Sequence, residues 1–147
     1  MSIFGPPKIS KLKAKGDINR LIKIFLQEND LELRKEAAYA LGELGDPSAV
    51  MPLISVLKNE FWGGFQMDPS DHMERASQYN GLRSVVAQVL GGLGDERAVD
   101  PLLAILDAHD PSIFDGTDYL LDVAVRALRE IGTTKANEGL EKRGHKR

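Results

Sequence analysis

The sequence contains no cysteine, only 6% aromatic residues and no long apolar run. Without thiols the chain cannot form disulfides, thiolate metal sites or a cysteine nucleophile, and this absence is compatible with a reducing compartment. A membrane-spanning helix needs about 20 largely apolar residues, and the start of the chain lacks an apolar segment of signal-peptide length. We therefore expect a cytoplasmic protein with no membrane span. The length of 147 residues predicts a single domain.

The chain as a whole has no large excess of one charge. It contains 19 Lys and Arg residues and 22 Asp and Glu residues, which gives a net charge of −3. The distribution is uneven: residues 17–134 contain 20 acidic and 10 basic side chains, whereas residues 1–16 contain four lysines and no acid. An acidic body opposes binding to nucleic-acid phosphates. We expect residues 1–16 to form a basic N-terminal cap segment and residues 143–147 a basic tail. Attraction of these ends to RNA or to an anionic membrane surface is the alternative.

One pattern occurs three times along the chain. The copies read LRKEAAYALGELGD, LRSVVAQVLGGLGD and LLDVAVRALREIGT, and they begin at Leu33, Leu82 and Leu120. Within each copy the apolar positions fall at i, i+4, i+7, i+8 and i+11, which places one apolar stripe on a helix. A glycine near the end of each copy suits the left-handed residue that stops a helix. These glycines are Gly45, Gly94 and Gly132.

A second set of helices alternates with the first. Its members are DINRLIKIFL, AVMPLISVLK, AVDPLLAILD and the shortened ANEGLEK, which begin at Asp17, Ala49, Ala98 and Ala136. Pro52 and Pro101 lie in first turns, where the missing N–H of proline removes no helical hydrogen bond. The two sets together predict antiparallel helix pairs, so the predicted fold class is all-α.

Two insertions interrupt the repeat. Equivalent leucines of the second set lie 32, 49 and 38 residues apart, and those of the first set lie 49 and 38 residues apart. The extra residues therefore fall between the two helices of a pair, at residues 59–79 and 107–118. Such connections project from one edge of a helical stack, so we expect two neighbouring loops.

The segments LRKEAAYALGELGDPSAVMPLISVL and LRSVVAQVLGGLGDERAVDPLLAIL resemble the HEAT-like repeats first named from phycobilin lyase subunits. The resemblance covers residues 17–142 and implies a short right-handed α-solenoid of about three HEAT-like helix pairs plus a partial C-terminal cap. It also implies a surface that grips other proteins, without implying one activity.

Two related families with defined chemistry fit these residues poorly. The repeats resemble those of deoxyhypusine hydroxylase, whose iron is held by His-Glu pairs, but the corresponding positions begin with Arg34, Arg83 and Leu121 and contain no histidine. HEAT-like DNA glycosylases need a basic groove, which an acidic body does not supply. The recurrence of Arg34 and Arg83 fits either a stacking ladder between helix pairs or ligand binding.

The loop at residues 59–79 is the first candidate for partner binding. Its aromatic residues include Phe61 and Tyr79. Aromatic side chains on a loop bury a large area at little entropic cost. The two insertions carry a net charge of −7, which favours a protein partner with a basic or apolar segment. The residues predicted to contact this partner are Trp62, Phe65, Met67, Asp68, Asp71, Asp110, Phe114 and Asp115. Alternatively, Phe61 and Trp62 cap the helix pair, and the aspartates form turns with neighbouring proline and glycine.

The exposed side of the first helix set is the second candidate surface. Tyr39, Gln88 and Arg126 share one repeat column that lies off the apolar stripe. This mixed face holds no nucleophile with a histidine base and no isolated pair of carboxylates. We therefore predict a non-catalytic protein-interaction module that needs no cofactor.

Other interpretations stay open. His72 and His109 fall in the two insertions and could hold a divalent ion with two aspartates, but no metal-binding motif is present and solvent-facing histidines are preferred. The main alternative function is an accessory subunit of an enzyme or chromophore-lyase complex, and a metal-dependent enzyme is the third. Self-association, with a basic end against an acidic edge of a second copy, is a further alternative.

Overall fold

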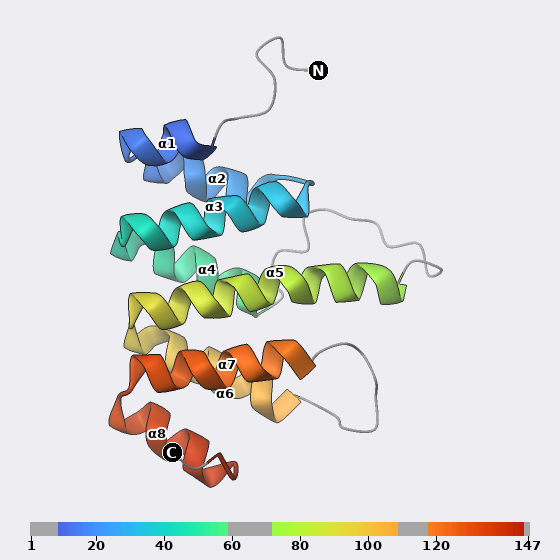
Figure 1. Cartoon of the computed structure of the whole chain (residues 1–147), viewed down its shortest axis with the longest axis vertical. Helices are drawn as coiled ribbons and strands as arrows, with labels where there is room; N and C mark the ends of the chain where they lie inside the picture. Colours follow the sequence, from blue (N-terminus) through green and yellow to red (C-terminus); the bar gives the residue numbers. More distant parts are fainter. Residues whose placement is uncertain (1–8, 59–71, 109–117, 146–147) are drawn as a thin grey trace.

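The chain folds as an all-α protein, as predicted. The computed structural model describes residues 9–58, 72–108 and 118–145, with the backbone alone described at residues 72–77 and 118. Within these ranges the chain forms eight α-helices and no strand (Figure 1).

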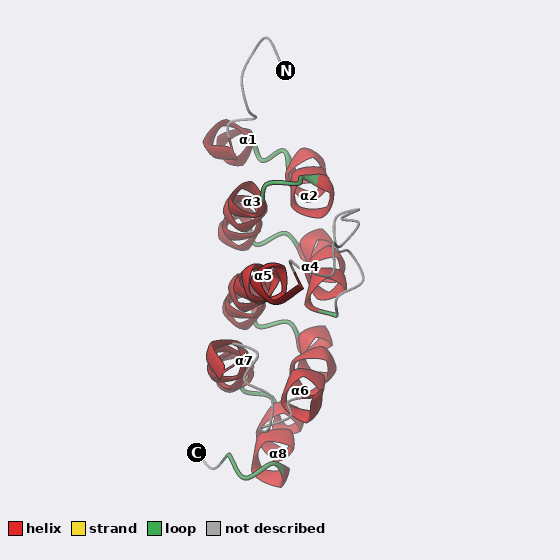
Figure 2. Ribbon diagram, turned by 90° about the vertical axis from the view of Figure 1, so that its right-hand side faces the viewer, coloured by secondary structure: helices red, strands yellow, loops and turns green. Residues whose placement is uncertain are grey.

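The helices form two layers, which Figure 2 shows side by side. The odd layer consists of α1 (Ile9–Lys15), α3 (Leu31–Leu44), α5 (His72–Leu93) and α7 (Asp118–Ile131). The even layer consists of α2 (Ile18–Gln27), α4 (Val50–Leu57), α6 (Val99–Ala108) and α8 (Thr134–Lys142). Two short 3-10 helices, η1 (Pro47–Ala49) and η3 (Glu96–Ala98), lead into α4 and α6. Successive helices alternate between the layers, which makes the chain an α-solenoid.

The passages from the odd to the even layer share one turn geometry. Gly45, Gly94 and Gly132 have φ angles of 68°, 67° and 65°, in the left-handed region that favours glycine. Their N–H groups donate to the carbonyl four residues earlier at 3.0–3.1 Å, which ends each helix. In the first two of these turns Asp46 and Asp95 then accept a backbone hydrogen bond at 2.9 Å and cap η1 and η3. The predicted helix stops are therefore confirmed.

The basic N-terminal segment contains a related Gly-Asp turn, in which the N–H of Gly16 donates to the carbonyl of Lys13, three residues earlier, at 3.0 Å. α1 is followed by Gly16, with a φ of 66°, and the side chain of Asp17 caps α2. α1 packs against α2 and α3, and its residues Ile9 and Leu12 are buried. Residues 9–16 therefore add half a repeat to the odd layer. The Gly-Asp dipeptide, which also closes the first two repeat copies, is the sequence signal for it.

At the other end of the described chain, α8 adds the complementary half-repeat to the even layer. Thr133 takes the place of the aspartate, and its hydroxyl accepts from the N–H of Ala136 at 3.2 Å. Ala136 and Leu140 are buried, whereas Glu138 and Glu141 are exposed. α8 is thus the predicted C-terminal cap.

A single apolar core lies between the layers. The predicted leucine columns are fully or almost fully buried; they are Leu41, Leu90 and Leu128 in the odd layer and Leu21, Leu53, Leu102 and Leu140 in the even layer. The close packing of α5 on α7 requires a residue without a side chain, because a Cβ at Gly91 would lie 2.7 Å from the Cα of Ala127.

The predicted bounds of the two inserted loops are wrong, because they include residues that the structure has in helices. α5 begins at His72, so residues 72–79 continue the helix instead of forming a loop. Tyr79 is buried, because it lies three residues before Leu82 and extends the apolar stripe by one turn. Asp107 likewise belongs to the last turn of α6.

Candidate protein-interaction surface

Two arginines are used inside the helix pairs and are not part of an exposed site. Arg34 of α3 is fully buried, and its Nε donates to the carbonyl oxygen of Phe25 at 2.7 Å. Arg83 of α5 is half-buried, and its Nε donates to the carbonyl oxygen of Leu57 at 2.9 Å. The repeat spacing makes Phe25 and Leu57 equivalent. Each arginine therefore joins an odd helix to the last turn of the preceding even helix.

Arg34 also makes a contact between the α2–α3 and α4–α5 pairs, as the stacking-ladder interpretation of the sequence expects, whereas its burial argues against an exposed ligand site. The guanidinium of Arg34 lies 5.9 Å from the ring centroid of Tyr79, and the hydroxyl of Tyr79 donates to the carbonyl of Val56 at 3.4 Å. Burial lowers the pKa of both arginines and raises the pKa of Tyr79. The three side chains thus form a desolvated structural cluster.

The structure brings two of the three predicted face residues together. Tyr39 of α3 is 43% exposed, and its hydroxyl lies 3.5 Å from Oε1 of Gln88 on α5, at the long end of the hydrogen-bonding range. Arg126 of α7 is exposed in the same repeat column. Tyr39, Gln88 and Arg126 therefore mark successive helices of the odd layer.

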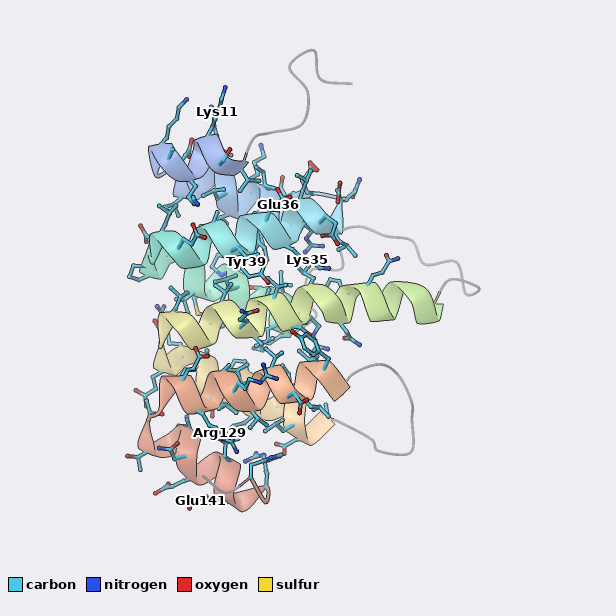
Figure 3. The ribbon with its side chains drawn as sticks, viewed as in Figure 1. Lys11, Lys35, Glu36, Tyr39, Arg129 and Glu141 are labelled. Carbon is cyan, nitrogen blue, oxygen red and sulfur yellow. The ribbon has the colours of Figure 1, made fainter. Side chains whose placement is uncertain are left out.

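An open groove lies between α1 and α3, with Tyr39 in its wall. Its volume is about 240 Å³. The lining residues are Ile9, Ser10, Lys13, Glu36, Tyr39, Ala40 and Glu43. Figure 3 labels Glu36 and Tyr39 on α3. Of the described large apolar side chains, Met51 and Tyr119 are also exposed, but Tyr39 alone lines this groove.

The carboxylates around the groove differ in their partners. Lys13 of α1 pairs with Glu43, and Lys35 pairs with Glu32 at 3.1 Å along α3. Glu36 lies between these pairs and forms no ion pair with any residue that the structure describes. The groove therefore presents one exposed carboxylate beside an exposed aromatic ring.

The loop-edge prediction is not tested by the structure. Trp62, Phe65, Met67, Asp68, Asp71, His109, Asp110, Phe114 and Asp115 lie outside the described residues, and only the backbone of His72 is described. Over residues 9–58, 72–108 and 118–145 there is no group of three or more His, Cys, Asp or Glu side chains that could hold a metal ion. No helix in those ranges is long and apolar enough to cross a membrane.

The stacked helix pairs define the class of the protein, an α-solenoid. Residues 33–59 and 82–108 match the PBS lyase HEAT-like repeat, and the chain is a HEAT-like repeat protein. Each match spans an odd helix, the Gly-Asp turn and the following even helix, which are α3 to α4 and α5 to α6. A comparison with curated proteins found no match. HEAT-like repeats are in general protein-interaction modules.

Proposed function

We propose that this chain is a non-catalytic protein-interaction module that binds a segment of another protein across the odd layer. The observation that carries the proposal is Tyr39, which is exposed, lines the α1–α3 groove and reaches Gln88 of the next odd helix. Exposed aromatic side chains in grooves are frequent anchors of protein interfaces.

The spacing of the odd helices suits an extended segment. Packed helices lie about 8–10 Å apart, and an extended chain advances about 3.3 Å per residue. A segment that crosses the layer would therefore meet Tyr39, Gln88 and Arg126 at intervals of about three residues. The amide of Gln88 both donates and accepts, as a peptide backbone requires, and Arg126 supplies a guanidinium with no ion pair to a described residue.

The test uses a random peptide library displayed on phage and selected against the full chain. Selected peptides are titrated into isotope-labelled protein, and backbone amide shifts are followed by NMR. We expect the largest shifts in α3, α5 and α7. We also expect Tyr39→Ala to weaken binding about tenfold, as the loss of an interface anchor does.

Met51→Ala is the matched control, because Met51 is 52% exposed on α4 in the other layer. It should leave peptide binding unchanged. Amide shifts confined to α2, α4 and α6, or to residues 59–71 and 109–117, would contradict binding across the odd layer. The second result would instead favour the acidic loop edge predicted from the sequence.

The second candidate function is an accessory subunit of an enzyme or chromophore-lyase complex. It is favoured by the PBS lyase type of the two matched repeats. The partner would then be a catalytic subunit, bound by the same surface. Addition of a linear tetrapyrrole, followed by absorption spectroscopy, tests direct contact with a chromophore: a saturable spectral shift supports the second candidate over the first.

A further inference from the structure

We infer that the partner segment places a lysine or arginine side chain in the α1–α3 groove, over Tyr39 and beside Glu36. This inference rests on the proposed function and adds the chemistry of one contact. Glu36 and Tyr39 are three residues apart on α3, so they lie on the same side of the helix, and both line the groove.

The charges of the groove favour a cation. Lys13 already pairs with Glu43, whereas Glu36 has no ion pair in the described part of the chain. A cation over the face of Tyr39 gains from the negative charge of the ring face as well as from Glu36. An acidic side chain would be repelled by Glu36, and an apolar one would remove water from that carboxylate without replacing its hydrogen bonds.

The apolar part of the lining fits the rest of such a side chain. Ile9 of α1 and Ala40 of α3, which are 8% and 4% exposed, form a narrow apolar floor of the groove. Lysine and arginine have long methylene stems that pack on apolar surface while the charged end stays near water and carboxylates. The groove therefore suits both ends of a basic side chain.

The test is a double-mutant cycle with the tightest peptide from the display selection. Each Lys and Arg of the peptide is replaced in turn by Gln, and dissociation constants are measured by fluorescence anisotropy. We expect one basic position whose replacement weakens binding of the wild-type protein by about fivefold to tenfold. Against Glu36→Gln combined with Tyr39→Leu, the same replacement should cost less than about twofold.

Met51→Ala is again the control, and it should preserve the full loss. Glu36 and Tyr39 are exposed, so circular dichroism should show unchanged helix content in the variants. A peptide that perturbs the odd layer but binds equally well without its basic residues would overturn this inference and leave the proposed function standing. A selection that yields no peptide on the odd layer would overturn both.

A second copy of the chain is the competing occupant of the groove. Sedimentation of the protein alone separates the two cases. We expect the same sedimentation for the wild type and for Glu36→Gln with Tyr39→Leu. A dimer that these substitutions abolish would overturn the assignment to another protein.

Discussion

In the α2–α3 and α4–α5 pairs an arginine of the odd helix donates to a carbonyl at the end of the even helix, whereas the α6–α7 pair has Leu121 at that position. In the third pair, ion pairs instead link α6 to α8 and to the residue that follows α8. Arg143 forms a bidentate ion pair with Asp107 at 2.7 and 2.8 Å, and Lys135 pairs with Asp100 at 2.8 Å.

The two modes of attachment differ in their environment. The hydrogen bond of Arg34 is buried and that of Arg83 partly buried, so solvent ions screen them little. The aspartates of the α8 ion pairs are exposed, and exposed pairs contribute little and are sensitive to salt. The comparison therefore predicts that the stability of the α2–α3 and α4–α5 pairs depends little on salt, whereas that of the α6–α7 pair depends more on it.

The largest expected effect is that of Arg34→Ala. The substitution removes a fully buried side chain and leaves the carbonyl of Phe25 without its 2.7 Å donor. We expect the free energy of unfolding to fall by about 3 kcal/mol, from the lost hydrogen bond and the cavity together. Urea denaturation followed by circular dichroism measures it. Arg20→Ala removes an arginine with a 76% exposed side chain and is the control, with an expected change near zero.

Arg83→Ala should have the same sign and a smaller size. Arg83 is only half-buried, so water can reach part of the site after the substitution. We expect a loss of about 1.5–2 kcal/mol by the same urea measurement. A loss for Arg83→Ala that exceeds that for Arg34→Ala would show that burial does not set the strength of these two links.

Leu121→Arg tests whether the missing link can be restored. The carbonyl of Leu106, in the last turn of α6, is the equivalent of those of Phe25 and Leu57. A new hydrogen bond there should stabilise the third pair by at most about 1 kcal/mol, because the half-buried leucine loses some apolar contact. Slower amide hydrogen exchange in α6 and α7 would report it. Leu121→Lys, which has the charge without the planar guanidinium, should not slow exchange.

The sequence predicts the helices and the core because both depend on periodicity. The columns that contain Leu41 and Leu53 are read directly from the repeat, and the left-handed glycine that ends each helix is local chemistry. Tyr79 shows the limit of this reasoning. The repeat pattern predicts a loop at Tyr79 because the second repeat copy begins at Leu82, although the spacing of Tyr79 continues the apolar stripe of α5.

The role of Arg34 and Arg83 could not be predicted from the columns. Recurrence shows that two residues share a position, but not which backbone carbonyl lies within reach of a long side chain. Tyr39 and Gln88 could be placed on one face from sequence, since equivalent positions on neighbouring helices must face the same way. The repeat pattern does not predict the groove, because Gly16-Asp17 alone marks α1 as half a repeat.

The ion pair of Arg143 with Asp107 predicts a dependence on pH with a defined sign. Hydrogen bonds from Arg143 hold the pKa of Asp107 below its usual 3.8. The stabilisation is therefore fully present above pH 3.8 and is lost as the pH falls through the lower value of the folded state. NMR titration of the Asp107 carboxyl should show the pKa rising in Arg143→Ala. The effect on stability should be smaller than that of Arg83→Ala, and 1 M salt should reduce it.

The smallest expected effect on stability is that of Tyr39→Ala, and it tests the division between residues that hold the fold and residues that bind. Tyr39 is exposed and its only described hydrogen bond is 3.5 Å long, so the free energy of unfolding should change by less than about 0.5 kcal/mol. Peptide binding should nevertheless weaken. If urea denaturation instead shows a loss comparable to that of Arg83→Ala, then Tyr39 is held in place for the fold, because it bridges α3 to α5. In that case the exposure of its ring would no longer support a binding role.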